Sequence, residues 1–401
     1  MRVPTTQIYL QGVEAFSQQQ AKLAKLQQQI STGVRLTKPS DDPVAATQVL
    51  GLEQTIQLQK QYQENISLAD SRLKLEESTL VSIENITFRL KELSIQANSG
   101  VINVDNRQAI ASEVKQRLEE LVSLANTQDA NGDSLFAGYQ GDTQPFATKA
   151  TGSIAHVEYS GDQGSRSLQV SESRQIQVTT PGSDIFLKLS SKTALNETAA
   201  TANTGTGAIS PAHVFNANTY VPSNLTITFT SATTYNVADS ATPANNITGA
   251  AYTPETDIDV GGVRFSIIGT PAAAGGDVFT VSAGQYKGIF ETVQVFSDTL
   301  TDSIDSEQRA ANLADFQEDL DTFFNRVLEV RASIGGRLNT LQSQMESNES
   351  NVIVTQATLA TLRDTDIAEA ISQLTLEQAT LDAALAVFSK ITSSSLFNYL
   401  K

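Results

Sequence analysis

The sequence predicts a mainly α-helical fold with an inserted antiparallel β domain. Proline and glycine both break long helices, and their distribution divides the 401 residues into three parts. No proline lies between Pro43 and Pro145, six lie from Pro181 to Pro271, and none follow. Glycine is likewise concentrated in the centre of the chain. Two flanks that can form long helices therefore enclose a central region that cannot.

The N-terminal flank carries two helical patterns. Asp42 followed by Pro43 is typical of a helix N-cap with proline in the first turn. From there to about Asn98 nothing breaks the helix, and about 55 residues at 1.5 Å each give a helix of about 80 Å. We expect Gly100 to end it. Before this helix, apolar residues seven apart predict one stripe of a terminal helix, namely Tyr9, Phe16, Leu23 and Ile30.

The C-terminal flank carries a coiled-coil pattern, in which apolar residues alternate steps of three and four. The stripe comprises Leu313, Phe316, Leu320, Phe323, Val327, Val330, Ile334, Leu338, Leu341 and Met345. Each flank needs an apolar partner, and pairing the two flanks in one long-helix bundle satisfies both. The terminal helices then form a coiled coil, and the two chain ends become neighbours.

The centre of the chain predicts β-structure, because apolar residues alternate with threonine around Leu225, Ile227 and Phe229. Further candidate strands carry the same alternation, at Ile176 and Val178, Ile258 and Val260, Val263 to Ile267, and Phe279 and Val281. Between these strands, the stretch from Thr193 to Ala212 is rich in alanine, threonine, asparagine and glycine, which predicts a flexible loop.

These patterns predict five segments. Residues 1–42 form the N-terminal helical part of an inner, terminal domain, and residues 43–142 form the N-terminal half of the helical bundle. Residues 143–287 form the inserted β domain. Residues 288–357 form the C-terminal half of the bundle, and residues 358–401 form the C-terminal helical part of the terminal domain.

The sequence carries no pattern typical of an enzyme or of a cofactor or metal site. Its net charge of −17 disfavours nucleic acid and anionic membrane as partners. Without cysteine, disulfides and thiolate sites are excluded. The two histidines, His156 and His213, lie in no nucleophile motif. No stretch approaches the ~18 apolar residues of a membrane span, and we expect no cleaved signal peptide.

The two terminal stripes are the candidate functional surface. Chain ends usually fray, so an apolar stripe at each end indicates that the helix becomes ordered against a partner subunit. We predict that this interface comprises Tyr9, Phe16, Leu23, Ile30, Leu381, Leu385, Phe388, Ile391, Leu396 and Phe397.

Several motifs carry a family resemblance. They are PSDDPVAA at 39–46, LFAG at 135–138, TQPF at 143–146, RASIGGRL at 331–338, DTDIAEA at 364–370 and LFNYL at 396–400. With these motifs the chain resembles the hook–filament junction proteins, the flagellar hook-associated protein 3 family of the bacterial flagellin superfamily. The resemblance covers residues 1–146 and 288–401 and leaves the β insertion without a recognised motif.

The resemblance implies a structural subunit outside the cell, in the bacterial flagellum. Such subunits pass through the flagellar type III export apparatus without a cleaved signal peptide and assemble with one another on hook-associated protein 1. Flagellin then polymerises on top of them. The resemblance also implies a cytoplasmic export chaperone that holds the C-terminal segment. Two alternatives stay open, a flagellin-type filament subunit and a surface adhesin that acts through the β insertion.

Overall fold

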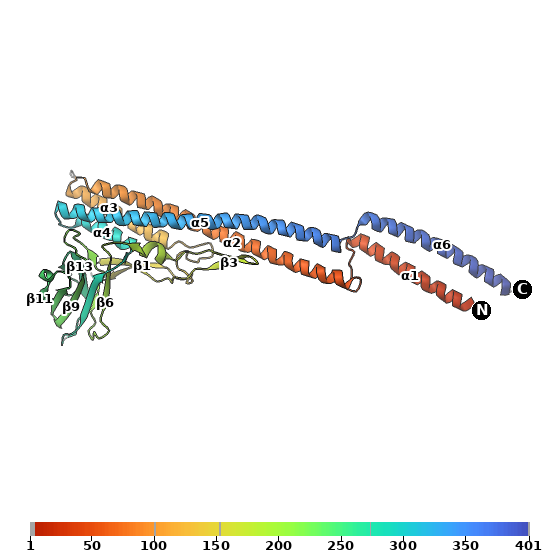
Figure 1. The fold of residues 1–401 in the computed structure, drawn as a ribbon, viewed down its shortest axis with the longest axis horizontal. Helices are drawn as coiled ribbons and strands as arrows, with labels where there is room; N and C mark the ends of the chain where they lie inside the picture. Colours follow the sequence, from red (N-terminus) through yellow and green to blue (C-terminus); the bar gives the residue numbers. More distant parts are fainter. Residues whose placement is uncertain (1–4, 100–101, 152–153, 273, 400–401) are drawn as a thin grey trace. The chain divides into compact units, whose positions relative to one another are not determined.

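The computed structural model divides into two compact units, which are described separately. Unit 1 comprises residues 1–64 and 344–401, and unit 2 comprises residues 65–343. The structure describes residues 5–99, 102–151, 154–272 and 274–399. Figure 1 labels the helices, which are α1 (Thr5–Thr32), α2 (Pro43–Ala97), α3 (Val104–Ala125), α4 (Ile289–Thr301), α5 (Ser306–Arg363) and α6 (Ile367–Tyr399). Both units share α2 and α5, whereas α1 and α6 belong to unit 1 alone.

The long helix α2 begins where the sequence predicts. The Ala45 backbone N–H donates a hydrogen bond of 3.0 Å to Oδ1 of Asp42, which makes Asp42 the N-cap and places Pro43 at the first helical position. The helix runs for 55 residues, as predicted. The expected terminator, Gly100, lies outside the described residues.

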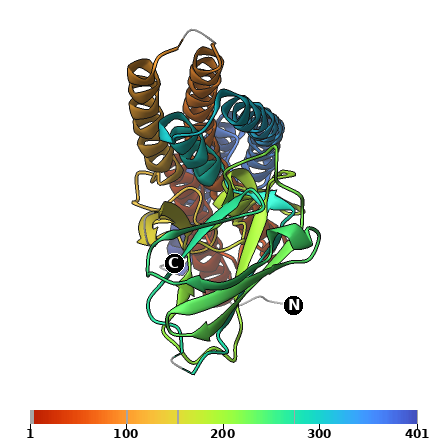
Figure 2. The same ribbon diagram turned by 90° about the vertical axis from the view of Figure 1, so that its left-hand side faces the viewer.

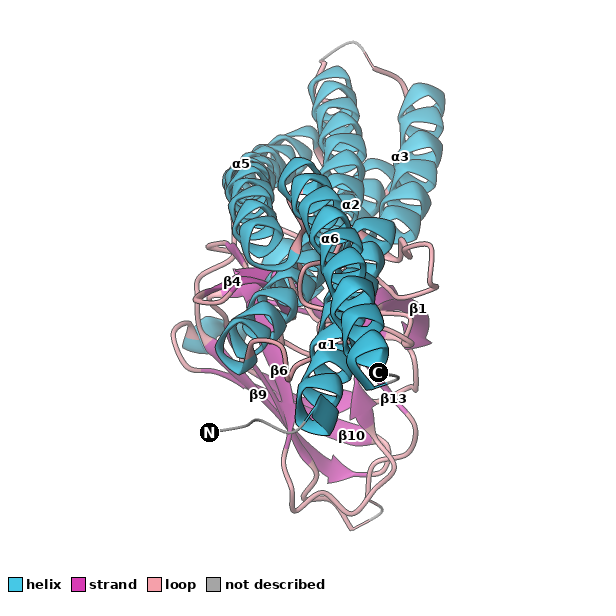
Figure 3. Ribbon diagram, turned by 90° about the vertical axis from the view of Figure 1, so that its right-hand side faces the viewer, coloured by secondary structure: helices cyan, strands magenta, loops and turns pink. Residues whose placement is uncertain are grey.

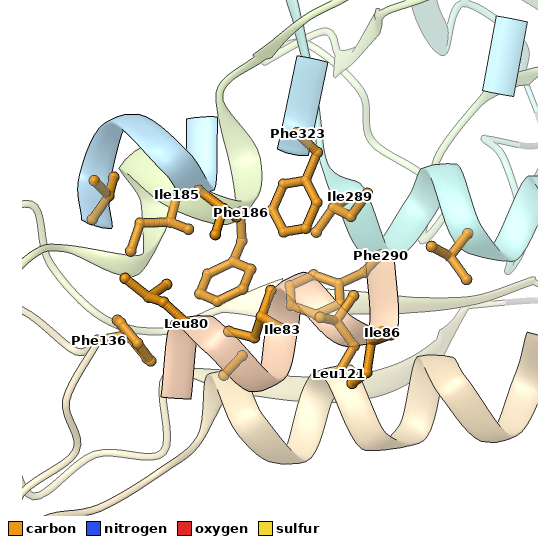
Figure 4. Packing of buried hydrophobic residues seen from close by; sticks show 14 of the residues in the cluster. Leu80, Ile83, Ile86, Leu121, Phe136, Ile185, Phe186, Ile289, Phe290 and Phe323 are labelled. Carbon is orange, nitrogen blue, oxygen red and sulfur yellow. The ribbon is translucent and has the colours of Figure 1, made fainter. Parts of the chain in front are cut away.

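The core of unit 2 is the large hydrophobic cluster between its helices. The α5 stripe predicted from the sequence is buried from Leu313 to Ile334 and again at Leu341, whereas Met345 is 38% exposed and lies in unit 1. Figure 4 shows phenyl rings from distant parts of the chain at the centre of this core. The rings of Phe186 and Phe290 stack with their centroids 5.5 Å apart.

The first part of the central region packs into this helical core. Its elements are the paired strands β1 (Phe146–Thr151) and β2 (Ile154–Tyr159), the paired strands β3 (Ser167–Ser171) and β4 (Arg174–Gln177), the π-helical turn η1 (Ser183–Leu187), and β5 (Leu189–Ser190), which pairs with β15 (Tyr286–Lys287). Phe146, Ile176 and Phe186 are buried in the same cluster as the helices. Residues 146–151 and 154–189 therefore contribute side chains to the helical core.

The rest of the central region forms a β domain with its own core. One sheet has the strand order β11-β10-β9-β14-β6, and the other has the order β12-β13-β7, with β8 also paired to β13. Phe229, Phe265 and Phe279 are fully buried between them, and every pairing is antiparallel, as predicted. In Figure 2 these green strands lie below the orange and teal helices of unit 2. The bounds are β6 (Leu195–Ala199), β7 (Ala208–Ile209), β8 (His213–Val214), β9 (Asn224–Ser231), β10 (Thr234–Asp239), β11 (Ile247–Ala251), β12 (Asp257–Val260), β13 (Val263–Ile268) and β14 (Val278–Ala283), with a 3-10 turn at η2 (Pro243–Asn245).

One expectation about this domain is wrong. The stretch from Thr193 to Ala212, predicted as a flexible loop, contains β6 and β7. Both strands form because distant partners complete them, β14 for β6 and β13 for β7, and local composition does not report such pairing. In the segment between β6 and β7, the backbone N–H groups of Thr204 and Gly205 donate to the carboxylate of Asp277 at 2.9 and 3.1 Å. These hydrogen bonds fix the position of the segment.

No helix in the described ranges has both the length and the apolar character needed to cross a bilayer.

Candidate assembly interface

In unit 1, the terminal helices α1 and α6 lie side by side and run antiparallel (Figures 1 and 3). Phe16 meets Phe388 edge to face, with the ring centroids 5.3 Å apart. Further along, Leu23 of α1 and Ala370 of α6 are buried. A Cβ atom at Gly12 would lie 2.6 Å from the Phe388 ring, so glycine allows this close approach. We call this contact the α1–α6 seam.

The chain segments that follow α1 and precede α6 hold the two helices together at one end. Val34 and Asp364 form an isolated antiparallel bridge. The Arg35 N–H donates to the Arg363 carbonyl at 2.7 Å, and the Thr365 N–H donates to the Gly33 carbonyl at 2.9 Å. Gly33 has a φ of +69°, which favours glycine. The DTDIAEA motif therefore joins the two terminal segments through backbone hydrogen bonds.

Two aspartates in the sequence motifs have local structural roles. Asp366 caps α6, since its Oδ1 accepts hydrogen bonds from the backbone N–H groups of Ala368 and Glu369 at 2.9 and 3.1 Å. Asp41, in the PSDDPVAA motif, accepts a hydrogen bond from Nζ of Lys25 at 2.9 Å. This bond is the main reason that the pKa of Asp41 lies below its usual value. Both motifs thus position α1, α2 and α6.

The seam covers little of the apolar surface of unit 1. The buried hydrophobic residues of unit 1, among those described, are Leu23, Ala45, Ile56, Leu359 and Ala370. Large apolar side chains of both terminal helices face solvent, and Leu376 is 68% and Leu385 48% exposed. A soluble monomer rarely leaves so many apolar groups uncovered, and such surfaces mark interaction sites.

The exposed apolar residues of α6 lie on both sides of the seam. At 3.6 residues per turn, these exposed residues form two groups that lie about half a turn apart around α6, one on each side of the seam. The first flank comprises Ile367, Ile371 and Leu385, and the second flank comprises Leu376 and Val387. An α6 helix already paired with α1 therefore still offers two apolar flanks.

The structure separates the predicted interface residues into three groups. Phe16, Leu23 and Phe388 lie in the α1–α6 seam, with Ile30 and Leu381 half-buried on the same stripes. Leu385 is exposed on the first flank. Tyr9, Ile391, Leu396 and Phe397 lie on α1 and α6, but their side chains fall outside the described residues. The roles of all ten residues in assembly and chaperone binding stay predictions.

Sequence reasoning missed four of the flank residues, namely Ile367, Ile371, Leu376 and Val387. The signal was that α6 is apolar around most of its circumference, so that a single stripe does not account for its composition. Within the described ranges, no group of three or more histidine and carboxylate side chains is placed to hold a metal ion.

Comparison with known proteins decides the family. Residues 3–141 match the model of the bacterial flagellin N-terminal helical region. Flagellar hook-associated protein 3 of Escherichia coli K12 is 26% identical over 401 residues, which cover 100% of both chains. The crystal structure of Xanthomonas campestris FlgL has 30% sequence identity and a TM-score of 0.51, and the match covers 77% of this chain and 99% of that one.

The chain belongs to the flagellar hook-associated protein 3 family. Flagellar hook-associated protein 3 of Salmonella typhimurium LT2 is 34% identical over 191 residues, so the match spans 48% of this chain and 58% of that relative. The flagellar junction protein FlgL of Legionella pneumophila, solved as a crystal structure, has 29% identity, a TM-score of 0.51 and coverage of 79% and 100%. Flagellin of Salmonella derby matches over 32% of this chain.

Membership in the hook-associated protein 3 family confirms two predictions from the sequence. The motifs indicated this family, and the helical patterns indicated long terminal flanks around an antiparallel β domain. The relatives are structural proteins of the flagellum.

Proposed function

We propose that this chain is a structural, non-enzymatic subunit that joins the flagellar hook to the flagellin filament. The observation that carries the proposal is the match over the full length of a flagellar hook-associated protein 3. A flagellin-type filament subunit is less well supported, because the flagellin match is confined to 32% of the chain.

The two apolar flanks of α6 support a tubular assembly. A subunit with one apolar patch can form a closed dimer, whereas a subunit with different patches on two sides contacts a different neighbour through each. Such heterologous contacts generate rings and helical tubes. In the proposed junction, copies of this chain contact one another through these flanks, with hook-associated protein 1 below them and flagellin above.

The same surface requires protection before assembly. Apolar side chains such as Leu376 and Val387 would drive aggregation of free subunits in the cytoplasm. We infer that an export chaperone covers the α6 segment until the chain enters the flagellar type III export apparatus. The subunit then acts outside the cell.

Deletion of the gene tests the proposal. Electron microscopy of the deletion strain should show hooks without filaments, and flagellin should accumulate in the culture medium because it is exported but has nothing to polymerise on. Intact filaments would refute the junction role and would leave the adhesin alternative. Bare hooks without flagellin anywhere would identify the chain as the filament subunit.

A further inference from the structure

Unit 2 contains a cavity of about 510 Å³ between its helices and its β domain. Helices α3 and α4 form one wall, and strands β2, β8, β12 and β13 contribute to the other. The cavity has the volume of a small-molecule site, and such sites are frequent where two structural layers meet. Both histidines of the chain line it.

Polar groups without partners face this cavity. The side chain of His213 on β8 is 7% exposed and makes no hydrogen bond to any described residue. Nδ1 of His156 is buried and also has no hydrogen-bond partner in the described structure. Buried polar atoms are normally satisfied, so the unsatisfied Nδ1 of His156, next to a His213 ring without a hydrogen bond in the described structure, indicates that a ligand completes the hydrogen bonding at this cavity.

The cavity has excess negative charge. The carboxylate of Glu291, in the first turn of α4, forms no hydrogen bond or ion pair with the described residues. The carboxylate of Asp298 accepts hydrogen bonds, among the described residues, only from Nε2 of Gln294, at 3.1 and 3.3 Å. Glu291 and Asp298 are seven residues apart, which places them on one face of α4. The cavity's arginine does not compensate, because Arg264 already pairs with Asp259 and Asp302, each at 2.8 Å.

The remaining wall is apolar. Leu118 and Val122 of α3 and Val295 of α4 line the cavity beside the carboxylates. A ligand must therefore combine a positive charge with a short hydrocarbon chain. A metal ion does not fit this description, and no described group of side chains is arranged to hold one.

We propose that this cavity binds a primary alkylammonium group, with the ammonium at Glu291 and Asp298 and the alkyl chain against Leu118, Val122 and Val295. An ammonium carries three N–H donors, which carboxylates and an unprotonated imidazole nitrogen accept. Glu291 and Asp298 are half-buried, and a carboxylate withdrawn from water is costly unless it is paired. The ligand supplies the missing partner. The proposal is independent of the junction role.

Calorimetry on the full chain tests this site with cadaverine, which carries two ammonium groups, and with pentane-1,5-diol as its uncharged counterpart. Cadaverine should bind and the diol should not. Glu291→Gln should weaken cadaverine binding by about tenfold or more, since it removes a charged hydrogen-bond acceptor. Glu172→Gln, an equal charge change at an exposed turn, should leave binding unchanged. Lys115→Ala should tighten it, because Lys115 is an exposed competing ammonium at the cavity.

A second measurement needs no variant that could misfold. The chain has two histidines, so cadaverine should shift both imidazole resonances in the NMR spectrum of the unmodified protein. Binding of Nα-acetyl-lysine methylamide as tightly as cadaverine would identify a protein lysine side chain as the natural occupant, and binding of cadaverine alone would identify a free amine. Absence of binding, equal binding of the diol, or unchanged affinity in Glu291→Gln would overturn the proposal.

Discussion

Glu76 is an acidic residue buried in the helical core of unit 2. It is 1% exposed, and its Oε1 has no hydrogen-bond partner in the described structure. Burial raises the pKa of Glu76 to about 7, against 4.5 for an ordinary glutamate, despite the opposing effects of Thr180 and Arg337. Arg331 is better satisfied, since its guanidinium reaches from α5 to Glu77 on α2 at 2.7 Å and also contacts Glu84.

The raised pKa predicts a pH-dependent stability. Glu76 is protonated more readily in the folded than in the unfolded chain, so its favourable contribution is complete below pH 4.5 and is lost as the pH rises through about 7. Glu76→Gln removes the charge and keeps the shape. Its free energy of unfolding in urea should therefore exceed that of the original chain by roughly 2–3 kcal/mol at about pH 8, with little difference near pH 4.5.

Glu172→Gln is the control for this series, because Glu172 is exposed, and it should follow the original chain at every pH. Parallel stability curves for Glu76→Gln and the original chain would contradict the raised pKa of the buried Glu76.

At the scale of residues, sequence predicts local features and misses those that depend on the tertiary fold. The Asp42 N-cap follows from two adjacent residues and is confirmed. The shared cavity of His156 and His213 could not be predicted, because it depends on how the β domain packs against α3 and α4.

At the scale of elements, α6 shows why a helical stripe does not by itself identify an interface. Leu381, Leu385 and Phe388 follow helical spacing and were predicted to share one surface. The structure places Phe388 in the seam against Phe16, whereas Leu385 is 48% exposed. Since α6 is apolar on several faces, its partner helix α1 decides which face is covered, and that choice is absent from the local pattern.

The β domain is the element whose separation from the helices can be tested. Its first and last strands meet, since Leu195 pairs with Ala283 and the Gly284 N–H donates to the Ala194 carbonyl at 2.7 Å. The chain therefore leaves and re-enters the helical core at nearly one point. Upstream of this point, Phe186 belongs to the helical core itself.

Two deletions should consequently behave differently. Removal of residues 195–283, with a short glycine–serine linker between 194 and 284, should keep the helical far-ultraviolet circular dichroism signal and a cooperative thermal transition. Removal of residues 150–285 also takes away Phe186 and other core side chains. It should lower the melting temperature sharply, because deleting a buried aromatic residue alone costs about 3–5 kcal/mol. Equal melting temperatures for the two deletions would contradict this division.

At the scale of the whole molecule, the two units differ in how completely they bury their apolar residues. Unit 2 encloses a continuous core that includes Leu73, Leu80 and Phe323, all fully buried. Unit 1 buries few of its described apolar residues and leaves both flanks of α6 exposed. We infer that unit 1 reaches its full stability only in the assembled flagellum, where neighbouring subunits cover its surface.

Substitutions on the two flanks should separate assembly from folding. Leu376→Asp with Leu385→Asp places a charge on each flank, outside the α1–α6 seam. The double variant should keep the circular dichroism spectrum of the original chain but should fail to restore filaments in the deletion strain. Val221→Asp, at a comparably exposed site of the β domain, should restore them. Normal filaments with the double variant would show that the flanks are dispensable.

The most direct test of the central claim, that neighbouring subunits cover the α6 flanks, is the reactivity of a single introduced cysteine. The chain has no cysteine of its own, so Leu385→Cys provides one defined site, with Ala244→Cys on the exposed surface of the β domain as the control for labelling. We expect a maleimide to label the cysteine at position 385 in the free subunit. It should not label this cysteine in purified hooks that carry the junction. Equal labelling of position 385 in free and assembled subunits would contradict the account.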